Sequence, residues 1–557
     1  MPRCLKTPEA LIFLVSTWIA LVCNTGFWHV IASNKPPGTL PTVLYLSSFL
    51  LVEIGLISFV MMLLVVGRPG RTVLGLALVV AAGANFFTAR YGVLFDPGML
   101  TNIVETNRAE AYELISPTLI AVLAVSGLIP AIAIWRYPLS PRRLPTALMH
   151  RSFATLIALG LIGGPLYASQ KEIFSVARNH QELRHMIAPI NILSASYVSV
   201  RNNLESPPTF QSIALDASHA NAATENRKPA VHVLIVGETA RAANFSLNGY
   251  ALNTNPELAQ RSGIQLLAVG SCGTATAVSL PCMFSNQERK GFDRDVADNE
   301  DNLLDIAMRS GYDVHWIDNG NGCKGICSRV ATVDVHSSHS ETICPDSECY
   351  DEILVENLQA VLSSVSKDTL IVLHQLGSHG PAYFRRYPET FRPFHPDCRS
   401  ANFGDCSQQE ISNAYDNTIA YTDHVIAAAI DALSAHTDDF SGSLIYISDH
   451  GESLGEHNLY LHGMPYQLAP SEQTTVPMIV WLGQNPLGHG RTMSTCTANA
   501  NATSISHDNL FHTELGILGI STDAYKPAMD IFSDCRTGIH LADSRIATQG
   551  MTVSPLD

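Results

Sequence analysis

Residues 230–239 read Ala-Val-His-Val-Leu-Ile-Val-Gly-Glu-Thr, an apolar run of strand length that ends on a glycine and a carboxylate. Other apolar runs of strand length follow at 313–317, 370–373, 444–447 and 476–482. The segments between them include helix-like ones such as 409–435. Strands that alternate with helices indicate a largely parallel sheet covered on both faces. We therefore expect residues 229–557 to form one α/β domain.

Polar side chains follow three of these runs. Glu238 ends the first run, Asp449 and His450 end another, and His374 leads into a Gly-Ser-His-Gly segment that contains His379. Ligands of parallel sheets bind beyond the carboxyl ends of the strands. Zinc accepts carboxylate and imidazole ligands in a tetrahedral arrangement. The sequence thus predicts a zinc site here, whereas a lone Asp-His pair would more often be a capping or surface pair.

A candidate nucleophile lies in the segment 271–282, Ser-Cys-Gly-Thr-Ala-Thr-Ala-Val-Ser-Leu-Pro-Cys. A hydroxyl group is a poor nucleophile at pH 7, and coordination to a cation lowers its pKa. A Thr or Ser of this segment could then attack an electrophile, held still by a disulfide between the flanking cysteines. The alternative for the fragment alone is a Ser/Thr-rich turn without chemistry.

The first 170 residues have the composition of a membrane domain. Hydrophobic residues make up 46% of the chain and charged residues only 15%, against about 25% charged in ordinary soluble proteins. Five apolar segments are near the ~20 residues that cross a bilayer as a helix: 10–31, 42–67, 72–88, 118–135 and 152–169. The first resembles a signal peptide, but further spans follow and a clear cleavage site does not, so we expect an uncleaved anchor.

Charge sets the orientation of these spans. Basic residues lie before the first span and in alternate loops: Arg3, Lys6, Arg68, Arg71, Arg136, Arg142, Arg143 and Arg151. The positive-inside rule places them in the cytoplasm, so five crossings deliver residues 171–557 to the opposite side. Residues 1–170 hold 11 Lys and Arg against 6 Asp and Glu, and the remainder holds 23 against 44. The formal net charge of −16 argues against a nucleic-acid partner.

The cysteines agree with this topology. Two lie in the membrane part, and the other ten all fall between Cys272 and Cys535. An even set of ten suits five disulfides, which persist in the periplasm or outside the cell. The alternative, zinc-binding thiols, lacks the paired CxxC spacing of a zinc ribbon.

Two connecting segments complete the organisation. Residues 171–228 have a helical, mixed-charge first part and a linker-like second part, and they are expected to bridge the two domains. The polar segment 91–116, which includes Asn102 and Glu105, faces outward and is a candidate for contact with a lipid headgroup. The alternative is a long loop with no ligand.

Five motifs resemble those of one family: 237–244 (Gly-Glu-Thr-Ala-Arg-Ala-Ala-Asn), 271–276 (Ser-Cys-Gly-Thr-Ala-Thr), 374–383 (His-Gln-Leu-Gly-Ser-His-Gly-Pro-Ala-Tyr), 448–456 (Ser-Asp-His-Gly-Glu-Ser-Leu-Gly-Glu) and 461–465 (Leu-His-Gly-Met-Pro). In this order they resemble the lipid A phosphoethanolamine transferases, which include the mobile colistin-resistance enzymes. The resemblance covers nearly the whole chain. It implies five inner-membrane spans, a bridging helix and a periplasmic domain of the alkaline phosphatase/sulfatase type.

The resemblance also implies roles for individual residues. It implies that one zinc ion is surrounded by Glu238, Thr276, Asp449 and His450. It also implies that Thr276 is the nucleophile that becomes phosphoethanolaminylated. It places His379 and His462 in the same pocket, where they assist phosphate binding, proton transfer or a second zinc ion. It makes Lys324 a phosphate contact. Gly320 departs from the family, which often has Asn there, so headgroup contacts at this position stay open.

The family's cysteine pairing implies five disulfides: Cys272–Cys282, Cys323–Cys327, Cys344–Cys349, Cys398–Cys406 and Cys496–Cys535. The sequence alone does not fix this connectivity.

The resemblance implies a reaction in two steps. Phosphatidylethanolamine gives its phosphoethanolamine to Thr276, and a lipid A phosphate then takes it, which lowers the negative surface charge and confers polymyxin (colistin) resistance. Alternatives are a phosphoglycerol transferase, or transfer to another envelope glycan. A sulfatase would need a Cys/Ser-x-Pro-x-Arg motif at the nucleophile, which is missing. The alternative of another class is a transporter or a non-catalytic sensor. Transporters usually show paired repeats and interrupted helices, and neither is evident in the five spans.

Overall fold

The structure, a computed structural model, divides into two compact units. It describes residues 7–67, 69–106, 108–138, 144–204, 209–219, 227–335, 343–345, 348–483 and 505–533. One unit comprises Met1–Ser206 with Ser453–Leu468, and the other comprises Pro207–Glu452 with Ala469–Asp557. They are called the helical unit and the α/β unit below.

Within its described residues, the helical unit contains four helices long and apolar enough to cross a membrane. These are α3 (Thr39–Leu64), α4 (Gly70–Tyr91), the composite helix Pro117–Arg136 and α9 (Leu144–Ala168). The composite helix joins α7 (Pro117–Val122) and α8 (Ile129–Arg136) through a π-helical turn. A bent pair, α1 (Pro8–Val22) and α2 (Thr25–Ser33), makes a fifth span if it is counted as one. The predicted five-span helical domain is thereby confirmed at four or five spans.

The span expected at 10–31 is not one straight helix, because α1 and α2 meet at 61°. Asn24 lies at the bend, and its side chain is used in tertiary hydrogen bonds. It donates to the Glu53 carboxylate of α3 (2.6 Å), and it accepts from the Ala188 backbone N–H (3.0 Å). These bonds connect the break, where the helical ladder is interrupted, to α3 and to the backbone at Ala188.

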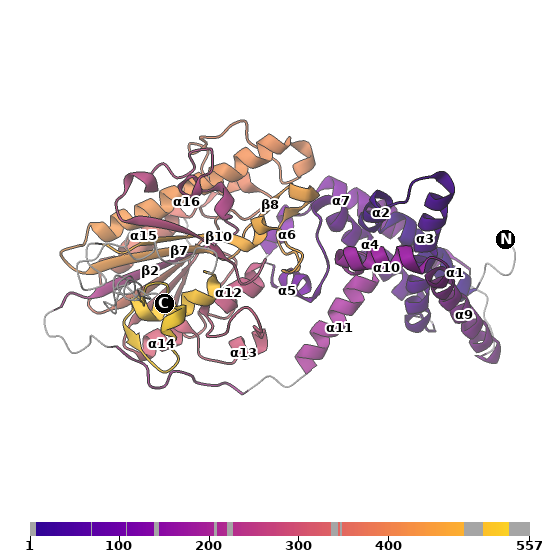
Figure 1. The fold of residues 1–557 in the computed structure, drawn as a ribbon, viewed down its shortest axis with the longest axis horizontal. Helices are drawn as coiled ribbons and strands as arrows, with labels where there is room; N and C mark the ends of the chain where they lie inside the picture. The colour runs from indigo at the N-terminus through magenta and orange to yellow at the C-terminus, as the bar shows by residue number, and fades with distance from the viewer. Residues whose placement is uncertain are drawn as a thin grey trace, which may run out of the picture. The chain divides into compact units, whose positions relative to one another are not determined.

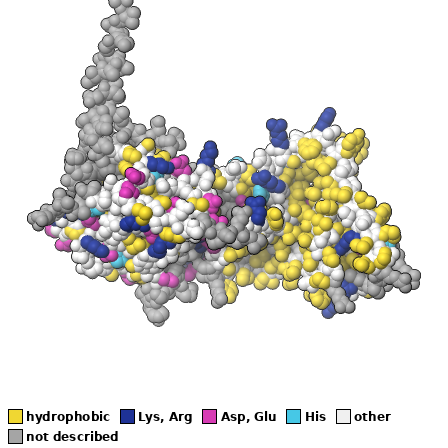
Figure 2. Space-filling view, turned by 90° about the horizontal axis from the view of Figure 1, so that it is seen from below, with side chains coloured by type: hydrophobic (Ala, Val, Ile, Leu, Met, Phe, Trp, Pro, Cys, Tyr) yellow, Lys and Arg dark blue, Asp and Glu magenta, His cyan; other side chains and the backbone are white. Residues whose placement is uncertain are grey.

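Apolar side chains predominate on the face of the helical unit that Figure 2 shows. On α9, Phe153 and Leu156 are each 65% exposed. An apolar surface this extensive is unfavourable in water and fits lipid contact. The shorter helices of this unit are α5 (Pro97–Glu105), α6 (Arg108–Glu113), α10 (Gln170–Asn179) and α11 (Ile190–Leu204).

The unit boundaries differ from those expected at 170 and 228. Ile173 and Val176 of α10 pack in a cluster with Phe27 of α2, so the first part of the bridge belongs to the helical unit. Residues 453–468, which contain β8 (Ser453–Leu454) and β9 (Tyr460–Leu461), also belong there. Leu459 lies against Gly92 at the end of α4, where a Cβ would come within 2.5 Å of the leucine side chain.

The α/β unit is built on a seven-stranded sheet in the order β3-β10-β7-β2-β6-β4-β5. The strands are β2 (Ala230–Gly237), β3 (Ile264–Gly270), β4 (Asp313–Asp318), β5 (Ala331–Asp334), β6 (Thr369–His374), β7 (Ser441–Ser448) and β10 (Thr475–Trp481). The pairs β7-β2, β2-β6, β6-β4 and β4-β5 are parallel, and β10 is antiparallel to both β7 and β3. The predicted, largely parallel α/β sheet is confirmed, with β3 and β5 as strands that the prediction did not include.

Helices cover both faces of this sheet (Figure 1). On one face lie α15 (Glu352–Leu362) and the long α16 (Gln408–Ser434). On the other, α12 (Thr276–Phe284), α14 (Leu303–Arg309) and α19 (Leu510–Ile517) pack with buried β-strand residues into one core cluster. Large apolar side chains dominate this face, as is usual for a parallel sheet covered on two faces, and His232 of β2 and Glu514 of α19 form a buried polar pair on it (2.9 Å).

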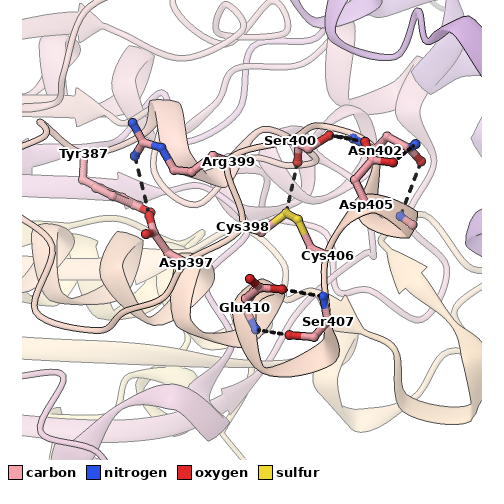
Figure 3. Close-up of a disulfide and its surroundings, with 11 residues drawn as sticks. Tyr387, Asp397, Cys398, Arg399, Ser400, Asn402, Asp405, Cys406, Ser407 and Glu410 are labelled. Atoms are coloured by element: carbon pink, nitrogen blue, oxygen red, sulfur yellow. Dashed lines mark hydrogen bonds and ion pairs between the residues drawn. A yellow bond between two sulfur atoms is a disulfide. The ribbon is translucent and has the colours of Figure 1, made fainter.

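Four disulfides lie in the α/β unit: Cys272–Cys282, Cys323–Cys327, Cys344–Cys349 and Cys398–Cys406. They are the pairs that the family resemblance implies; the fifth, Cys496–Cys535, lies outside the described residues. Figure 3 shows Cys398–Cys406 beside the start of α16, where Ser407 and Glu410 form a reciprocal capping box. The Cys398–Cys406 disulfide therefore anchors the loop before α16 to the capped start of that helix.

A buried histidine makes the α/β unit sensitive to acid. Burial, together with the charge of Lys526, lowers the pKa of His512 from 6.5 to about 4. Between these values the unfolded chain takes up a proton that the folded chain does not, so stability is lost as the pH falls from 6.5 towards 4. We expect the melting temperature of the detergent-solubilised chain to fall over this range, and to fall less in His512→Asn. Equal slopes in the two proteins would contradict this role for His512.

Candidate metal centre and nucleophile

Two neighbouring parallel strands bring three metal-ligating side chains together. Glu238 follows β2, and Asp449 and His450 follow β7, with Gly237 and Ser448 paired in register. One ligand atom from each of the three side chains lies within 4.8 Å of the others, and all three residues are buried. The strand ends thus converge where the sequence places the zinc site.

Thr276 completes this group as the first residue of α12. Its Oγ1 lies 3.0 and 3.2 Å from the two carboxylate oxygens of Glu238, and 3.3 Å from Nε2 of His450. At a helix N-terminus, backbone N–H groups and the helix dipole favour negative charge. Glu238, Thr276, Asp449 and His450 together form the candidate metal centre.

The loop that leads to Thr276 is held by backbone and side-chain bonds. The N–H of Ser271 donates to the carbonyl of Thr474 (2.8 Å), and that of Gly273 donates to Oγ of Ser279 (2.8 Å). The Cys272–Cys282 disulfide ties the loop to α12. The hydroxyl therefore has a fixed position, as a reacting group needs.

The electrostatics of the centre favour a cation. Burial would raise the pKa of Glu238, but the His450 imidazole beside it holds this pKa well below its usual range. Burial and the charge of Glu238 raise the pKa of Asp449. Burial would lower the pKa of His450, but the two carboxylates raise it to about 10. Two buried carboxylates this close need positive charge between them.

The donor set fits zinc. Nδ1 of His450 lies 2.9 Å from the carbonyl of Gly451; this acceptor places the hydrogen on Nδ1 and directs the Nε2 lone pair at the centre. Asp449 Oδ1 accepts from two backbone N–H groups, whereas its Oδ2 accepts no hydrogen bond from the described residues. Two carboxylates, one imidazole and a hydroxyl are ligands that zinc takes in tetrahedral sites.

His379 belongs to the same unit and lies close enough for its charge to lower the pKa of Glu238. Its loop passes Glu238 closely: Gly377 has a φ of +56°, and a Cβ there would lie 2.6 Å from the Glu238 carbonyl oxygen. The buried Asp351 carboxylate fixes this loop by accepting from the N–H groups of Leu376 (2.8 Å) and Gly377 (2.9 Å). Sequence reasoning missed Asp351, which lies far from every motif.

Lys324 lies in a turn closed by the Cys323–Cys327 disulfide, with a left-handed φ of 48°. Arg294 connects this turn to the helix of the nucleophile. Its guanidinium donates to the Lys324 carbonyl (3.0 Å) and to the Ala277 carbonyl in α12 (2.6 Å).

The remaining expected site residues lie in the helical unit. Asn102 and Glu105 are on α5, and His462 directly follows β9. Gly463 packs against Met99 of α5, where a Cβ would come within 2.5 Å of the methionine methyl group. His462 and α5 are therefore both assigned to the helical unit, and the residues of the metal centre are assigned to the α/β unit.

The comparisons with known proteins agree with this architecture. Residues 230–520 match the sulfatase family, and residues 54–204 match the phosphoethanolamine transferase EptA/EptB family. The phosphoethanolamine transferase EptA of Escherichia coli K12 is 37% identical, over 96% of this chain and 99% of its own. The phosphatidylethanolamine transferase Mcr-1 of Escherichia coli is 34% identical, over 93% of this chain and 96% of its own.

A solved structure matches the whole fold. The integral membrane lipooligosaccharide phosphoethanolamine transferase A of Neisseria meningitidis superposes with a TM-score of 0.91 at 34% identity, covering 95% of this chain and 98% of that one. The chain therefore belongs to the EptA/EptB phosphoethanolamine transferases, and it is an enzyme that combines membrane-spanning helices with a sulfatase-type α/β domain.

Proposed function

We propose that this enzyme transfers phosphoethanolamine from phosphatidylethanolamine to a lipid A phosphate through a covalent intermediate on Thr276. The observation that carries the proposal is the position of the Thr276 hydroxyl, 3.0–3.3 Å from the Glu238 carboxylate and the His450 imidazole. The lipooligosaccharide acceptor named for the Neisseria relative supports lipid A as the acceptor class.

The reaction balances in two displacements. Thr276 Oγ1 gives up its proton and attacks the phosphorus of phosphatidylethanolamine; the bond from phosphorus to the diacylglycerol oxygen breaks, and that oxygen takes a proton. An oxygen of the lipid A phosphate then attacks the same phosphorus, and Thr276 leaves and regains its proton. Glu238, Thr276, Asp449 and His450 would hold zinc, whose positive charge would lower the pKa of the Thr276 hydroxyl and offset negative charge on the phosphoryl group.

The other expected residues have supporting roles in this proposal. His379 donates or accepts the transferring proton. The role that the family resemblance implies for His462, in proton transfer or with a second zinc ion, stays a prediction. Lys324 contacts the phosphate, and its turn is linked to α12 through Arg294. Asn102 and Glu105 bind a lipid headgroup.

We place the helical unit in the bacterial inner membrane and the α/β unit in the periplasm. The disulfides support this placement because a reducing cytosol would not maintain them. Both lipid substrates expose their headgroups at that membrane surface. A phosphoethanolamine on lipid A lowers the negative charge of the cell surface, and we expect polymyxin (colistin) resistance to follow.

Mass spectrometry of lipid A tests the function. Cells that express this protein should contain lipid A with one additional phosphoethanolamine, and cells that express Thr276→Ala should not. Supplying the purified enzyme with phosphatidylethanolamine or phosphatidylglycerol separately distinguishes the phosphoglycerol alternative. Unmodified lipid A together with a modified core sugar would identify another envelope glycan as the acceptor.

A further inference from the structure

His507 is a buried histidine whose two ring nitrogens both bond to backbone groups. Its Nδ1 lies 3.0 Å from the backbone nitrogen of Cys272, and its Nε2 lies 3.0 Å from the carbonyl oxygen of Ser448. A backbone N–H can only donate and a carbonyl can only accept. The ring is therefore neutral, with its hydrogen on Nε2.

The two backbone partners of His507 belong to the two halves of the metal centre. Cys272 lies in the loop that carries Thr276, and Ser448 is the last residue of β7, directly before Asp449 and His450. One imidazole thus spans from the loop of the nucleophile to the strand end that carries two metal ligands. These two hydrogen bonds of His507 go to backbone groups and not to the side chains of Thr276, Asp449 or His450.

The backbone around His507 holds this bridge in place. The carbonyl of Ile505 accepts from the N–H of Gly270 (3.0 Å), so the chain before His507 runs beside the end of β3. Ser506 caps the following turn in a reciprocal bond with Asn509. Burial lowers the pKa of His507 to about 3, which agrees with the neutral form that its hydrogen bonds require.

We propose that His507 is a positioning residue of the transfer reaction, which sets the distance between the Thr276 hydroxyl and the ligands Asp449 and His450. This inference rests on the proposed role of Thr276 as the nucleophile. A fixed spacing matters because a misplacement of about 1 Å at a reacting group costs about 100-fold in rate.

Two conservative variants separate the two halves of the bridge. In His507→Asn, the amide oxygen replaces Nδ1 as the acceptor for Cys272, and the bond to Ser448 is lost. In His507→Gln, the longer amide reaches the carbonyl of Ser448, and the bond to Cys272 is lost. His512→Asn is the matched control, because His512 lies five residues on, is as deeply buried, and bonds to the backbone of Lys526, away from the metal centre.

The full-length enzyme is assayed in mixed micelles of phosphatidylethanolamine and lipid A. The readouts are kcat, KM, the adduct on Thr276, zinc content and melting temperature. We expect both His507 variants to lower kcat about 10- to 100-fold with KM within about twofold of wild type. The zinc content of both His507 variants should stay at the wild-type level. His512→Asn should keep the wild-type kcat even if its melting temperature falls as much as that of the His507 variants.

Three results would overturn the inference. If both His507 variants keep the wild-type kcat, the positioning role is contradicted and the proposed function is not. The same holds if kcat falls equally in His512→Asn, because the effect would then come from lost stability. Absence of a Thr276 adduct in the wild-type enzyme contradicts the proposed function, and the positioning role with it.

Discussion

Thr276→Ala is expected to lower the rate of phosphoethanolamine transfer by about 10⁴-fold or more, because it removes the atom that forms the covalent intermediate. Of the four side chains that form the metal centre, Thr276 carries the hydroxyl, and its Oγ1 lies 3.0 Å from a carboxylate oxygen of Glu238. Phosphatidylethanolamine should label the wild-type enzyme with one phosphoethanolamine on the peptide that contains residue 276. The mutant should carry none.

Two further variants make this result specific. Thr276→Ser keeps the hydroxyl and should retain the adduct at a reduced rate, since only a methyl group is lost. Thr274→Ala changes the neighbouring threonine of the same buried loop and should leave the adduct on Thr276. An adduct that persists in Thr276→Ala at the wild-type level would show that another residue is the nucleophile.

The convergence of Glu238, Asp449 and His450 could be predicted from the sequence because these residues lie at the ends of recognisable strands. Glu238 and Asp449 follow apolar runs of strand length, and parallel strands bring their carboxyl ends to one edge. The position of Thr276 depends on the resemblance to a family, since the hydroxyls of its loop are alike in sequence terms.

Residues that act through tertiary contacts were not predictable. Asp351 and His507 support the site, but each lies far in sequence from the groups it holds. The bend between α1 and α2 depends on Asn24 meeting Glu53 and Ala188, 29 and 164 residues further along the chain. Hydrophobic periodicity carries no information on such partners, because it reports the burial of a segment and not its neighbours.

The same limit applies to the boundary between the units. Residues 453–468 come shortly after β7, Asp449 and His450 in the sequence, so the sequence analysis includes them in the α/β domain. In the structure they pack on α4 and α5 instead, with Leu459 against Gly92 and Gly463 against Met99. The glycines permit this approach because they have no Cβ, a reason that is visible only once both segments are placed.

Removing the cation should both inactivate and destabilise the enzyme. Without positive charge, Glu238 and Asp449 are two buried carboxylates whose ligand atoms lie within 4.8 Å of each other and of His450. We expect chelation to lower the melting temperature of the wild-type enzyme, because a ligand at 100 times its Kd contributes about 2.7 kcal/mol to stability. Asp449→Asn should lose zinc and fall about 10³-fold or more in kcat.

The response of stability to chelation separates a metal ligand from a structural carboxylate. Asp449→Asn should have a melting temperature that chelation no longer changes, and without metal it should be more stable than the wild type, since one of two repelling charges is gone. Asp416→Asn is the matched control: Asp416 is fully buried and accepts from Asn244 (2.6 Å) and Tyr250 (2.9 Å), away from the metal centre. This variant should melt at a lower temperature and keep the full response to chelation. If removal of zinc leaves the melting temperature of the wild-type enzyme unchanged, zinc binding at the four residues of the metal centre does not stabilise the fold. The assignment of this metal centre would then be wrong.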